Sequence, residues 1–325
     1  MVILKNIISR NKIFERLSIT TVLSLILALF ISCAKDEIFI NTISKSLEIS
    51  IDNENLKLTN SSISSNESCN NVFVSCRYES PKDAGFRIEF RLTKSGALRN
   101  IRLFDYRNGN SHFESADFNP KGLIAITNFS YDETKKYLHF DFKGELLEQA
   151  YGDELDVAKK RKFVEGSITI TDVRNTQCTS FTPNLIFETT NLRFLSNDNF
   201  GSNDSTLKTN PYQFFFYSDN GYRTIFRSNK DLWNLEKGTY TFDQNTIENR
   251  IDFEQYIGIF RATQLLWIRD IEWKKFQTSG CYTIKEHVMI NGLKVTKGEM
   301  ALQVYDNGIL LYSSNNGTFE VTGFN

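Results

Sequence analysis

The chain has few of the residues and motifs on which common enzyme classes depend. Its 325 residues include only three histidines, His112, His139 and His287. It has no G-x-S-x-G nucleophile elbow, no H-E-x-x-H zinc motif and no glycine-rich phosphate loop. Paired carboxylates for glycoside hydrolysis would leave no local signature, because the two acids meet only in the folded protein. The sequence therefore favours a protein without catalytic residues or a cofactor, with a surface hydrolase as the alternative.

An excess of charge of one sign is also missing. The 38 lysines and arginines are balanced by 39 aspartates and glutamates, which leaves a formal net charge of −1. Proteins that bind nucleic acids normally carry a clear excess of basic residues. No nucleic-acid partner is therefore expected.

The spacing of a strong metal site is absent as well. His112, Glu114 and Asp117 lie close together in the sequence, but exposed loops commonly carry such mixtures. A second acidic group, Asp153–Asp156, lacks the regular oxygen spacing and turn glycine of a calcium loop. No two cysteines have the C-x-x-C spacing of a zinc site. We expect no bound metal.

Proline is scarce, at 4 residues, whereas Phe (27) and Tyr (13) are abundant. Aromatic residues favour strands, and Asn-Gly pairs favour tight hairpin turns. The segment Phe86–Leu92 (FRIEFRL) alternates apolar and polar residues with the period of a half-buried strand. Tight turns are predicted at Asn220-Gly221, Asn307-Gly308 and Asn316-Gly317, so that the end of the sequence would form three strands.

These patterns predict an all-β fold that is antiparallel and sandwich-like, with few helices. It would form either one large domain or two tandem β domains, at residues 51–180 and 181–325. The charged segment Leu146–Lys162 is the main helix candidate, because its acidic residues precede its basic ones, as a helix dipole favours. Gly152 interrupts the segment, and a charged hairpin is the alternative.

Long apolar runs are missing except for one near the start. Thr21–Ser32 contains no charged residue. A membrane span needs about twenty apolar residues, so this run is too short for a comfortable permanent anchor. A basic start, a short apolar centre and a small residue before the cut are typical of a secretory signal. We expect residues 1–32 to form such a signal, and its basic residues are Lys5, Arg10, Lys12 and Arg16.

The residues around Cys33 resemble the signals of Bacteroidota-type surface lipoproteins. The tetrapeptide FISC, which ends at Cys33, is similar to the lipobox, and CAKDE, which begins there, is similar to the surface-export signal of that group. The resemblance covers residues 1–37 only. It implies that Cys33 carries fatty acyl chains such as palmitate, and that Lys35, Asp36 and Glu37 route the protein to the surface of the outer membrane of a Gram-negative bacterium. Residues 33–50 would then form a lipidated tether, held firmly if two or three acyl chains are attached.

Four cysteines remain once Cys33 is assigned to lipid. An even number of cysteines in an exported protein indicates disulfides, and four of them allow three pairings. Cys69 and Cys76 are close enough in sequence to close a hairpin, which would leave Cys178 to pair with Cys281. The alternative is four reduced thiols that pack like small apolar residues. We expect at least one disulfide and favour the short pair.

Aromatic residues provide the best indication of a binding surface. The segment Leu265–Phe276 (LLWIRDIEWKKF) places Trp267, Arg269 and Trp273 on one face of a predicted strand. Indole rings beside cationic side chains suit stacking on sugars or docking on a partner protein. The same residues would also serve as core, with basic side chains reaching outward to solvent.

A basic strip would attract acidic glycans or form a solvated strand face. Its residues are Arg87, Arg91, Arg99, Arg102 and Arg107. Together these features predict a cell-surface lipoprotein, held at the membrane by its N-terminal lipid, that binds glycans or host or partner proteins without catalysis. The alternatives are a surface-anchored hydrolase and a structural subunit of an outer-membrane complex.

Overall fold

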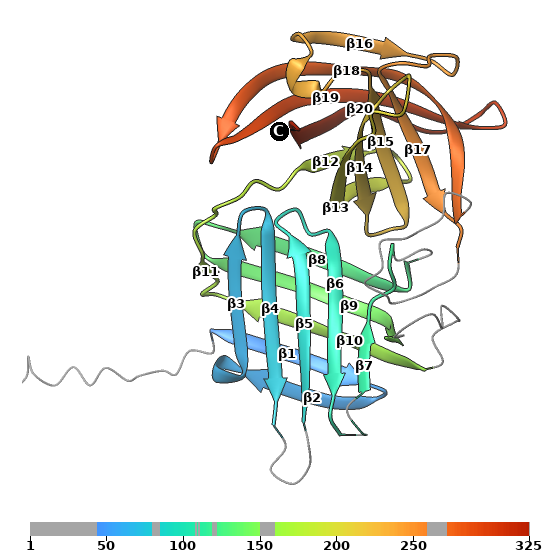
Figure 1. The fold of residues 1–325 in the computed structure, drawn as a ribbon. Helices are drawn as coiled ribbons and strands as arrows, with labels where there is room; N and C mark the ends of the chain where they lie inside the picture. Colours follow the sequence, from blue (N-terminus) through green and yellow to red (C-terminus); the bar gives the residue numbers. More distant parts are fainter. Residues whose placement is uncertain are drawn as a thin grey trace, which may run out of the picture. The chain divides into compact units, whose positions relative to one another are not determined.

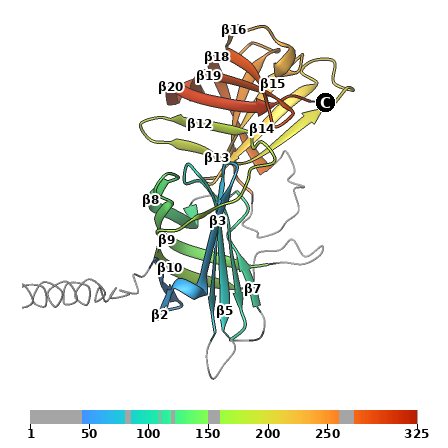
Figure 2. The ribbon, with the colours of Figure 1, turned by 90° about the vertical axis from the view of Figure 1, so that its left-hand side faces the viewer.

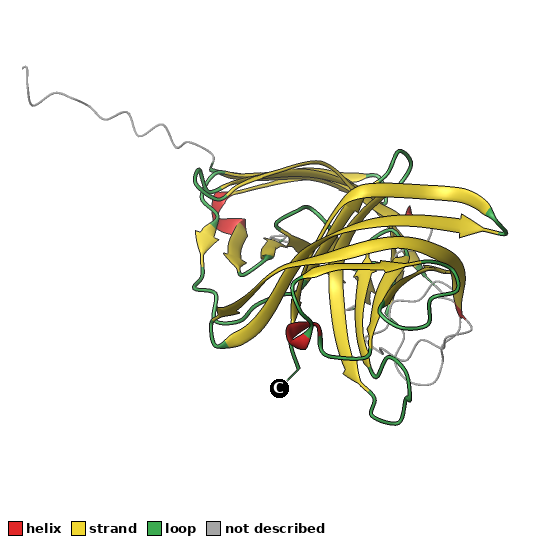
Figure 3. Cartoon of the chain, turned by 90° about the horizontal axis from the view of Figure 1, so that it is seen from above, coloured by secondary structure: helices red, strands yellow, loops and turns green. Residues whose placement is uncertain are grey.

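The described part of the chain consists mainly of β-strands. A computed structural model describes residues 44–79, 85–107, 109, 111–118, 122–149, 160–258 and 272–324. These residues form two sheets, and helix is confined to short 3-10 turns such as η1 (Asn60–Ser62) and η3 (Leu232–Asn234). Figure 3 shows how far strand exceeds helix. The prediction of an all-β fold is confirmed, and of its two alternatives, one large domain or two tandem β domains, the two sheets agree with the second.

The first sheet contains the strands from Lys45 to Asn175 (Figure 1). Its hydrogen-bonded order is β11-β3-β4-β5-β6-β7-β9-β10-β1-β2, and β8 pairs with β9 outside this path. All pairs are antiparallel except β11 with β3. The strands are β1 (Lys45–Ile51), β2 (Glu54–Thr59), β3 (Ile63–Ser68), β4 (Asn71–Tyr78), β5 (Phe86–Thr93), β6 (Leu98–Asp105), β7 (Ser111–Glu114), β8 (Ile124–Asp132), β9 (Tyr137–Glu148), β10 (Arg161–Ile170) and β11 (Arg174–Asn175).

The first sheet folds over so that two sets of strands enclose one core. In Figures 1 and 2, β3–β6 cross β1, β9 and β10 as a separate layer. The ring centroid of Phe90 on β5 lies 5.4 Å from that of Phe140 and 4.8 Å from that of Phe142, both on β9. All apolar residues of β5 are buried, as its period-two alternation predicts. The charged residues of β5 therefore lie on the outer face.

Residues 45–50 belong to this sheet and not to the expected tether. Leu47 and Ile49 point into the core and are 0% and 3% exposed. Along its length β1 pairs with both β10 and β2. The segment looks polar in the sequence because Ser46, Glu48 and Ser50 alternate with these two apolar residues.

The second sheet contains the strands from Asn184 to Thr322 and closes on itself. Its order is β16-β18-β17-β15-β14-β13-β12-β20-β19, and an additional pairing of β18 with β19 closes the sheet. The strands are β12 (Asn184–Glu188), β13 (Arg193–Asn203), β14 (Tyr212–Ser218), β15 (Tyr222–Ser228), β16 (Gly238–Phe242), β17 (Arg250–Tyr256), β18 (Trp273–Ile290), β19 (Leu293–Asp306) and β20 (Ile309–Thr322).

Aromatic rings fill the interior of the closed sheet. The rings of Phe187 and Phe194 stack with 4.7 Å between centroids, and those of Phe226 and Phe319 lie 4.9 Å apart. All four side chains are at most 1% exposed. Side chains of this size fill a small closed sheet, so a binding surface has to be sought on its outside or on the first sheet.

Two of the three predicted Asn-Gly turns are confirmed, and one is wrong. Gly221 (φ 82°) and Gly308 (φ 81°) occupy the left-handed region between β14 and β15 and between β19 and β20. At Asn316-Gly317 the strand β20 continues, and Gly317 lies opposite Met300 beside an irregularity in the pairing. A Cβ on Gly317 would lie 2.5 Å from Cγ of Met300. Glycine is needed there for packing and not for a turn.

The ends of the helix candidate Leu146–Lys162 are strands. β9 extends to Glu148 and β10 begins at Arg161, and Leu146 pairs with Lys162. Ion pairs link the two strands, with Arg161 to Glu145 at 2.6 Å and Lys160 to Glu148 at 3.2 Å. Residues 150–159 lie outside the described ranges. The described ends therefore follow the charged-hairpin alternative, because cross-strand pairing uses the same opposite charges that favoured a helix.

The expected disulfide is present, but its pairing differs from the favoured one. Cys69, in the β3–β4 turn, is bonded to Cys178, in the connection between the sheets. Cys76 is a fully buried free thiol, and Cys281 is free and half-buried. Cys76 lies roughly 17 Å along β4 from the turn, at about 3.3 Å per residue, which is too far for a disulfide with Cys69.

Candidate functional site

Four side chains form a row across the outer face of β3, β4, β5 and β6. Strand pairing places Asn66 opposite Phe73, Phe73 opposite Arg91, and Arg91 opposite Asn100. We call these four residues the cross-strand row. It crosses three inter-strand spacings, roughly 14 Å.

The row lines an open cavity of about 650 Å³. The position of each side chain follows from local alternation, because Phe73 lies between two fully buried valines of β4 and Arg91 lies between two fully buried residues of β5. Phe73 is half-buried, and Arg91 is exposed. The remaining lining residues are Asn71, Val72, Arg99 and Asp198.

One arginine, Arg99, links two other residues that line the cavity. Nη1 of Arg99 donates to Oδ1 of Asn71 at 2.9 Å, and Nη2 donates to Oδ1 of Asp198 at 3.0 Å. Asp198 belongs to β13 of the second sheet. Both sheets therefore contribute to the cavity, and the charge of Arg99 is compensated.

The polar side chains of the row have no hydrogen-bond partner among the described residues. Among the described residues, the side chains of Asn66, Arg91 and Asn100 form no hydrogen bond or ion pair. The guanidinium of Arg91 lies 5.8 Å from the ring centroid of Phe73. Oδ1 of Asn100 is buried. Polar groups in folded proteins are usually satisfied by protein or solvent, so the groups available to a ligand are the side chains of Asn66 and Arg91 and Nδ2 of Asn100.

The other arginines of the basic strip are neutralised by neighbouring acids. Arg87 pairs with Glu89 at 3.3 Å, and Arg102 pairs with Glu114. The strip is therefore not a uniformly basic face, which weakens the expectation of general attraction to acidic glycans.

Arg107 also has acidic partners. It pairs with Asp105 at 2.9 Å and with Glu54 at 2.5 Å. Burial opposes the charge of Asp105, but hydrogen bonds from Arg107 outweigh it and lower the pKa of that carboxyl. Of the five arginines in the strip, only Arg91 lacks an acidic partner among the described residues.

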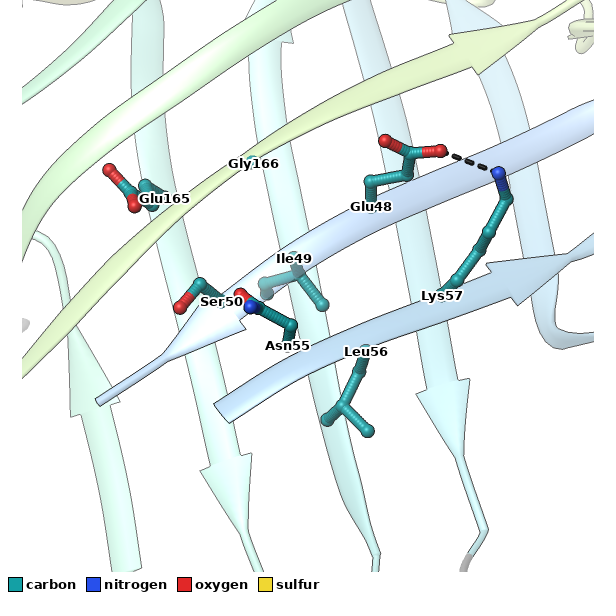
Figure 4. A pocket seen from close by; sticks show the side chains of 8 residues that line it. All are labelled: Glu48, Ile49, Ser50, Asn55, Leu56, Lys57, Glu165 and Gly166. Atoms are coloured by element: carbon teal, nitrogen blue, oxygen red, sulfur yellow. Dashed lines mark hydrogen bonds and ion pairs between the residues drawn. The ribbon is translucent and has the colours of Figure 1, made fainter. Parts of the chain in front are cut away.

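A second, smaller cavity of about 400 Å³ lies over β1, β2 and β10 (Figure 4). Its charged groups are already paired, with Glu48 to Lys57 at 2.5 Å and Glu165 to Lys143 at 2.8 Å. None of its described lining residues is aromatic. The cross-strand row is therefore the stronger candidate site.

Trp273, a candidate binding residue, lies inside the protein. It is 4% exposed, and the rings of Phe118, Tyr217 and Tyr256 lie 5.2, 6.0 and 5.3 Å from its ring. The guanidinium of Arg223 lies 4.2 Å from the same ring. This arrangement agrees with the core interpretation of Trp273, since its ring faces protein groups and not solvent.

The other two groups of candidate site residues lie outside the described ranges. Neither Trp267 and Arg269 nor the lipidation and export residues, Cys33 and Lys35 to Glu37, are described. The cross-strand row does not depend on any of them.

The histidines have structural contacts. His112 stacks on Phe104 with 4.4 Å between centroids, and burial lowers the pKa of its imidazole. His139 shares a hydrogen bond with Thr169, and His287 bonds the carbonyl of Leu235, each at 3.0 Å. No group of three or more metal-ligating side chains occurs in the described ranges, and Asp153–Asp156 lies outside them.

Sequence reasoning selected Arg91 and Arg99 as part of the basic strip but missed Asn66, Phe73 and Asn100. The signal was present for Phe73, an aromatic residue at an outward position between two valines. Cross-strand register brings these residues together, and register is not visible in a single sequence. No protein-family model matches the chain, and no significantly similar protein was found among curated proteins or solved structures.

Proposed function

We propose that the protein is a lipoprotein of the outer membrane, anchored through Cys33 and exposed on the cell surface, whose folded part binds glycans without catalysis. The observation that carries the binding role is the cross-strand row, with three unused polar side chains beside a half-buried phenylalanine. Amides and guanidinium groups form paired hydrogen bonds with neighbouring hydroxyls. An aromatic ring offers an apolar face against which the C–H groups of a sugar pack.

The charges at the cavity favour binding over hydrolysis. Asp198 is the one carboxylate among the described lining residues, and it is paired with Arg99. Hydrolysis of a glycosidic bond normally needs two carboxyl groups on opposite sides of the bond. The volume of about 650 Å³ is within the range of ligand-binding pockets.

The N-terminal signals support the proposed location. A short apolar run ending at Cys33 and the Lys35-Asp36-Glu37 signal resemble those of surface lipoproteins. An acyl anchor at Cys33 would hold a glycan-binding module where extracellular glycans are accessible.

The binding role is tested with the full chain, purified in detergent, on a glycan array. We expect Phe73→Ala to weaken binding about 5- to 30-fold, because loss of a stacking ring costs on the order of 1 to 2 kcal/mol. Phe163→Ala is the matched control, since Phe163 is also a partly exposed strand residue with a cation, Lys143, 5.7 Å from its ring centroid. Absence of any bound glycan, or equal losses in both variants, would overturn the proposal.

The location is tested separately. Cys33→Ala should abolish labelling by a fatty-acid analogue and release the protein from the membrane fraction. Replacement of Lys35, Asp36 and Glu37 by alanine should keep the lipid but remove accessibility to external protease. A Cys33→Ala variant that stays acylated would refute the lipid anchor.

A further inference from the structure

The unpaired charge in the cavity defines the ligand more narrowly. Arg99 is balanced by Asp198, whereas Arg91 has two neutral cross-strand neighbours, Phe73 and Asn100. Among the described lining residues this leaves one uncompensated positive charge, that of Arg91, in the middle of the row. A ligand that contacts the whole row therefore meets a cation flanked by neutral polar and aromatic groups.

Arg91 is suited to hold a planar anion. Its guanidinium has five donors in a rigid fork that matches the two oxygens of a carboxylate. The ring of Phe73, 5.8 Å from the guanidinium, and direct pairing with Asn100 limit the directions in which the side chain points. A carboxylate that approaches from the cavity can accept two parallel hydrogen bonds there.

Asn66 and Asn100 require more of the ligand than a negative charge. The amide of Asn66 offers donors and an acceptor, whereas that of Asn100 offers only its donor group, because its Oδ1 is buried. Neither side chain is hydrogen-bonded among the described residues. A carboxylate only accepts hydrogen bonds, so hydroxyl groups beside the anion would match the acceptor of Asn66 and the donor of Asn100. A chain of sugars that includes a sugar acid has both groups.

Building on the proposed glycan binding, we infer that the cavity selects acidic oligosaccharides, with the carboxylate of a uronic acid bound by Arg91. Phe73 packs against a sugar ring, and Asn66 and Asn100 bond hydroxyls of the flanking sugars. The extent of the row, roughly 14 Å, suits an oligosaccharide spread over several strands.

The test compares an oligogalacturonide with its carboxyl-reduced, neutral counterpart, using the full chain in detergent and titration calorimetry. We expect the acidic form to bind about ten- to a hundred-fold more tightly, as a charge-assisted hydrogen-bonded pair provides. Added salt should weaken binding of the acidic form and leave that of the neutral form nearly unchanged.

Three variants assign the effect to Arg91. Arg91→Ala should remove the preference for the acid, and Arg91→Lys should keep part of it, because lysine retains the charge but not the fork. Arg77→Ala is the matched control. Arg77 lies on the same outer face of β4 as Phe73, but it is exposed and already paired with Glu79. Circular dichroism establishes that each variant is folded.

The outcomes separate this inference from the proposed function. Equal affinity for the acidic and neutral forms would overturn the acidic preference and leave glycan binding standing. A preference for a sulfated oligosaccharide without carboxyl groups over the oligogalacturonide would overturn the assignment to a carboxylate. Failure of every glycan to bind would overturn both.

Discussion

Arg99 on β6 and Asp198 on β13 form an ion pair of 3.0 Å between residues 99 positions apart in the sequence, one from each sheet. Both main-chain polar groups of the adjacent residue, Leu98, form hydrogen bonds with side chains. Its amide donates to Oδ2 of Asp219 at 2.9 Å, and its carbonyl accepts from Nδ2 of Asn197 at 2.5 Å. The start of β6 is thus linked to the second sheet by polar contacts at the edge of the candidate site.

The ion pair itself is expected to contribute little to stability. The side chains of Arg99 and Asp198 are 31% and 49% exposed, and pairs that are this exposed contribute at most about 1 kcal/mol. A double-mutant cycle with Arg99→Ala and Asp198→Ala, followed by urea denaturation, measures their coupling. A coupling energy above about 2 kcal/mol would contradict this expectation.

Asp219 is expected to make stability fall as pH rises. Burial raises the pKa of its carboxyl to about 6 from the ordinary value of 3.8, although the amide of Leu98 opposes the shift. Between the two pKa values the carboxyl is ionised in the unfolded state but still protonated in the folded state, so the free energy of unfolding decreases as pH rises. Its destabilising effect is absent below about pH 4 and fully present above about pH 6, with an upper limit of about 3 kcal/mol.

Asp219→Asn provides the comparison, because its carbonyl still accepts from the amide of Leu98. The melting temperature of the native protein, measured relative to this variant, should decrease between pH 4.5 and pH 7.5. A constant difference across that range would show that Asp219 has an unshifted pKa.

The Cys69–Cys178 disulfide is expected to be a major stabilising element. It closes a loop with a sequence separation of 109 residues, and a disulfide across such a loop typically contributes about 2 to 5 kcal/mol. Cys69→Ser with Cys178→Ser should lower the midpoint of guanidinium unfolding and abolish its sensitivity to reductant. Cys281→Ser, which removes a free thiol, should retain that sensitivity. Peptide mapping that found Cys69 bonded to Cys76 would refute the pairing.

Substitution of Trp273 is expected to change stability, whereas substitution of Phe73 is expected to change glycan affinity. Trp273→Ala should lower the free energy of unfolding by about 3 to 5 kcal/mol, because it removes a buried ring. Glycan affinity of the folded fraction should stay unchanged. Phe73→Ala should show the opposite behaviour, with weaker binding and a smaller loss of stability. Loss of affinity in folded Trp273→Ala would indicate a binding surface at Trp273 instead of the row.

Much of the local structure follows from neighbouring residues. The alternation in β5 identified its buried and outward faces, and the positive φ accessible to Gly221 and Gly308 identified two hairpins. The same reasoning failed at Gly317, where a contact with Met300 explains the glycine. A local pattern cannot distinguish a glycine needed for a turn from one needed for packing, because the latter depends on a distant strand.

The all-β class, the alternating faces of the strands and the expectation of a disulfide could all be predicted from the sequence, because each depends on residue type and short-range spacing. Tertiary structure decided the pairing of Cys69 with Cys178, the burial of Trp273 and the assembly of Asn66, Phe73, Arg91 and Asn100. Each of these depends on strand register and on contacts between residues far apart in the chain. Such contacts form only when apolar faces are buried together, and their positions are therefore set by the whole fold.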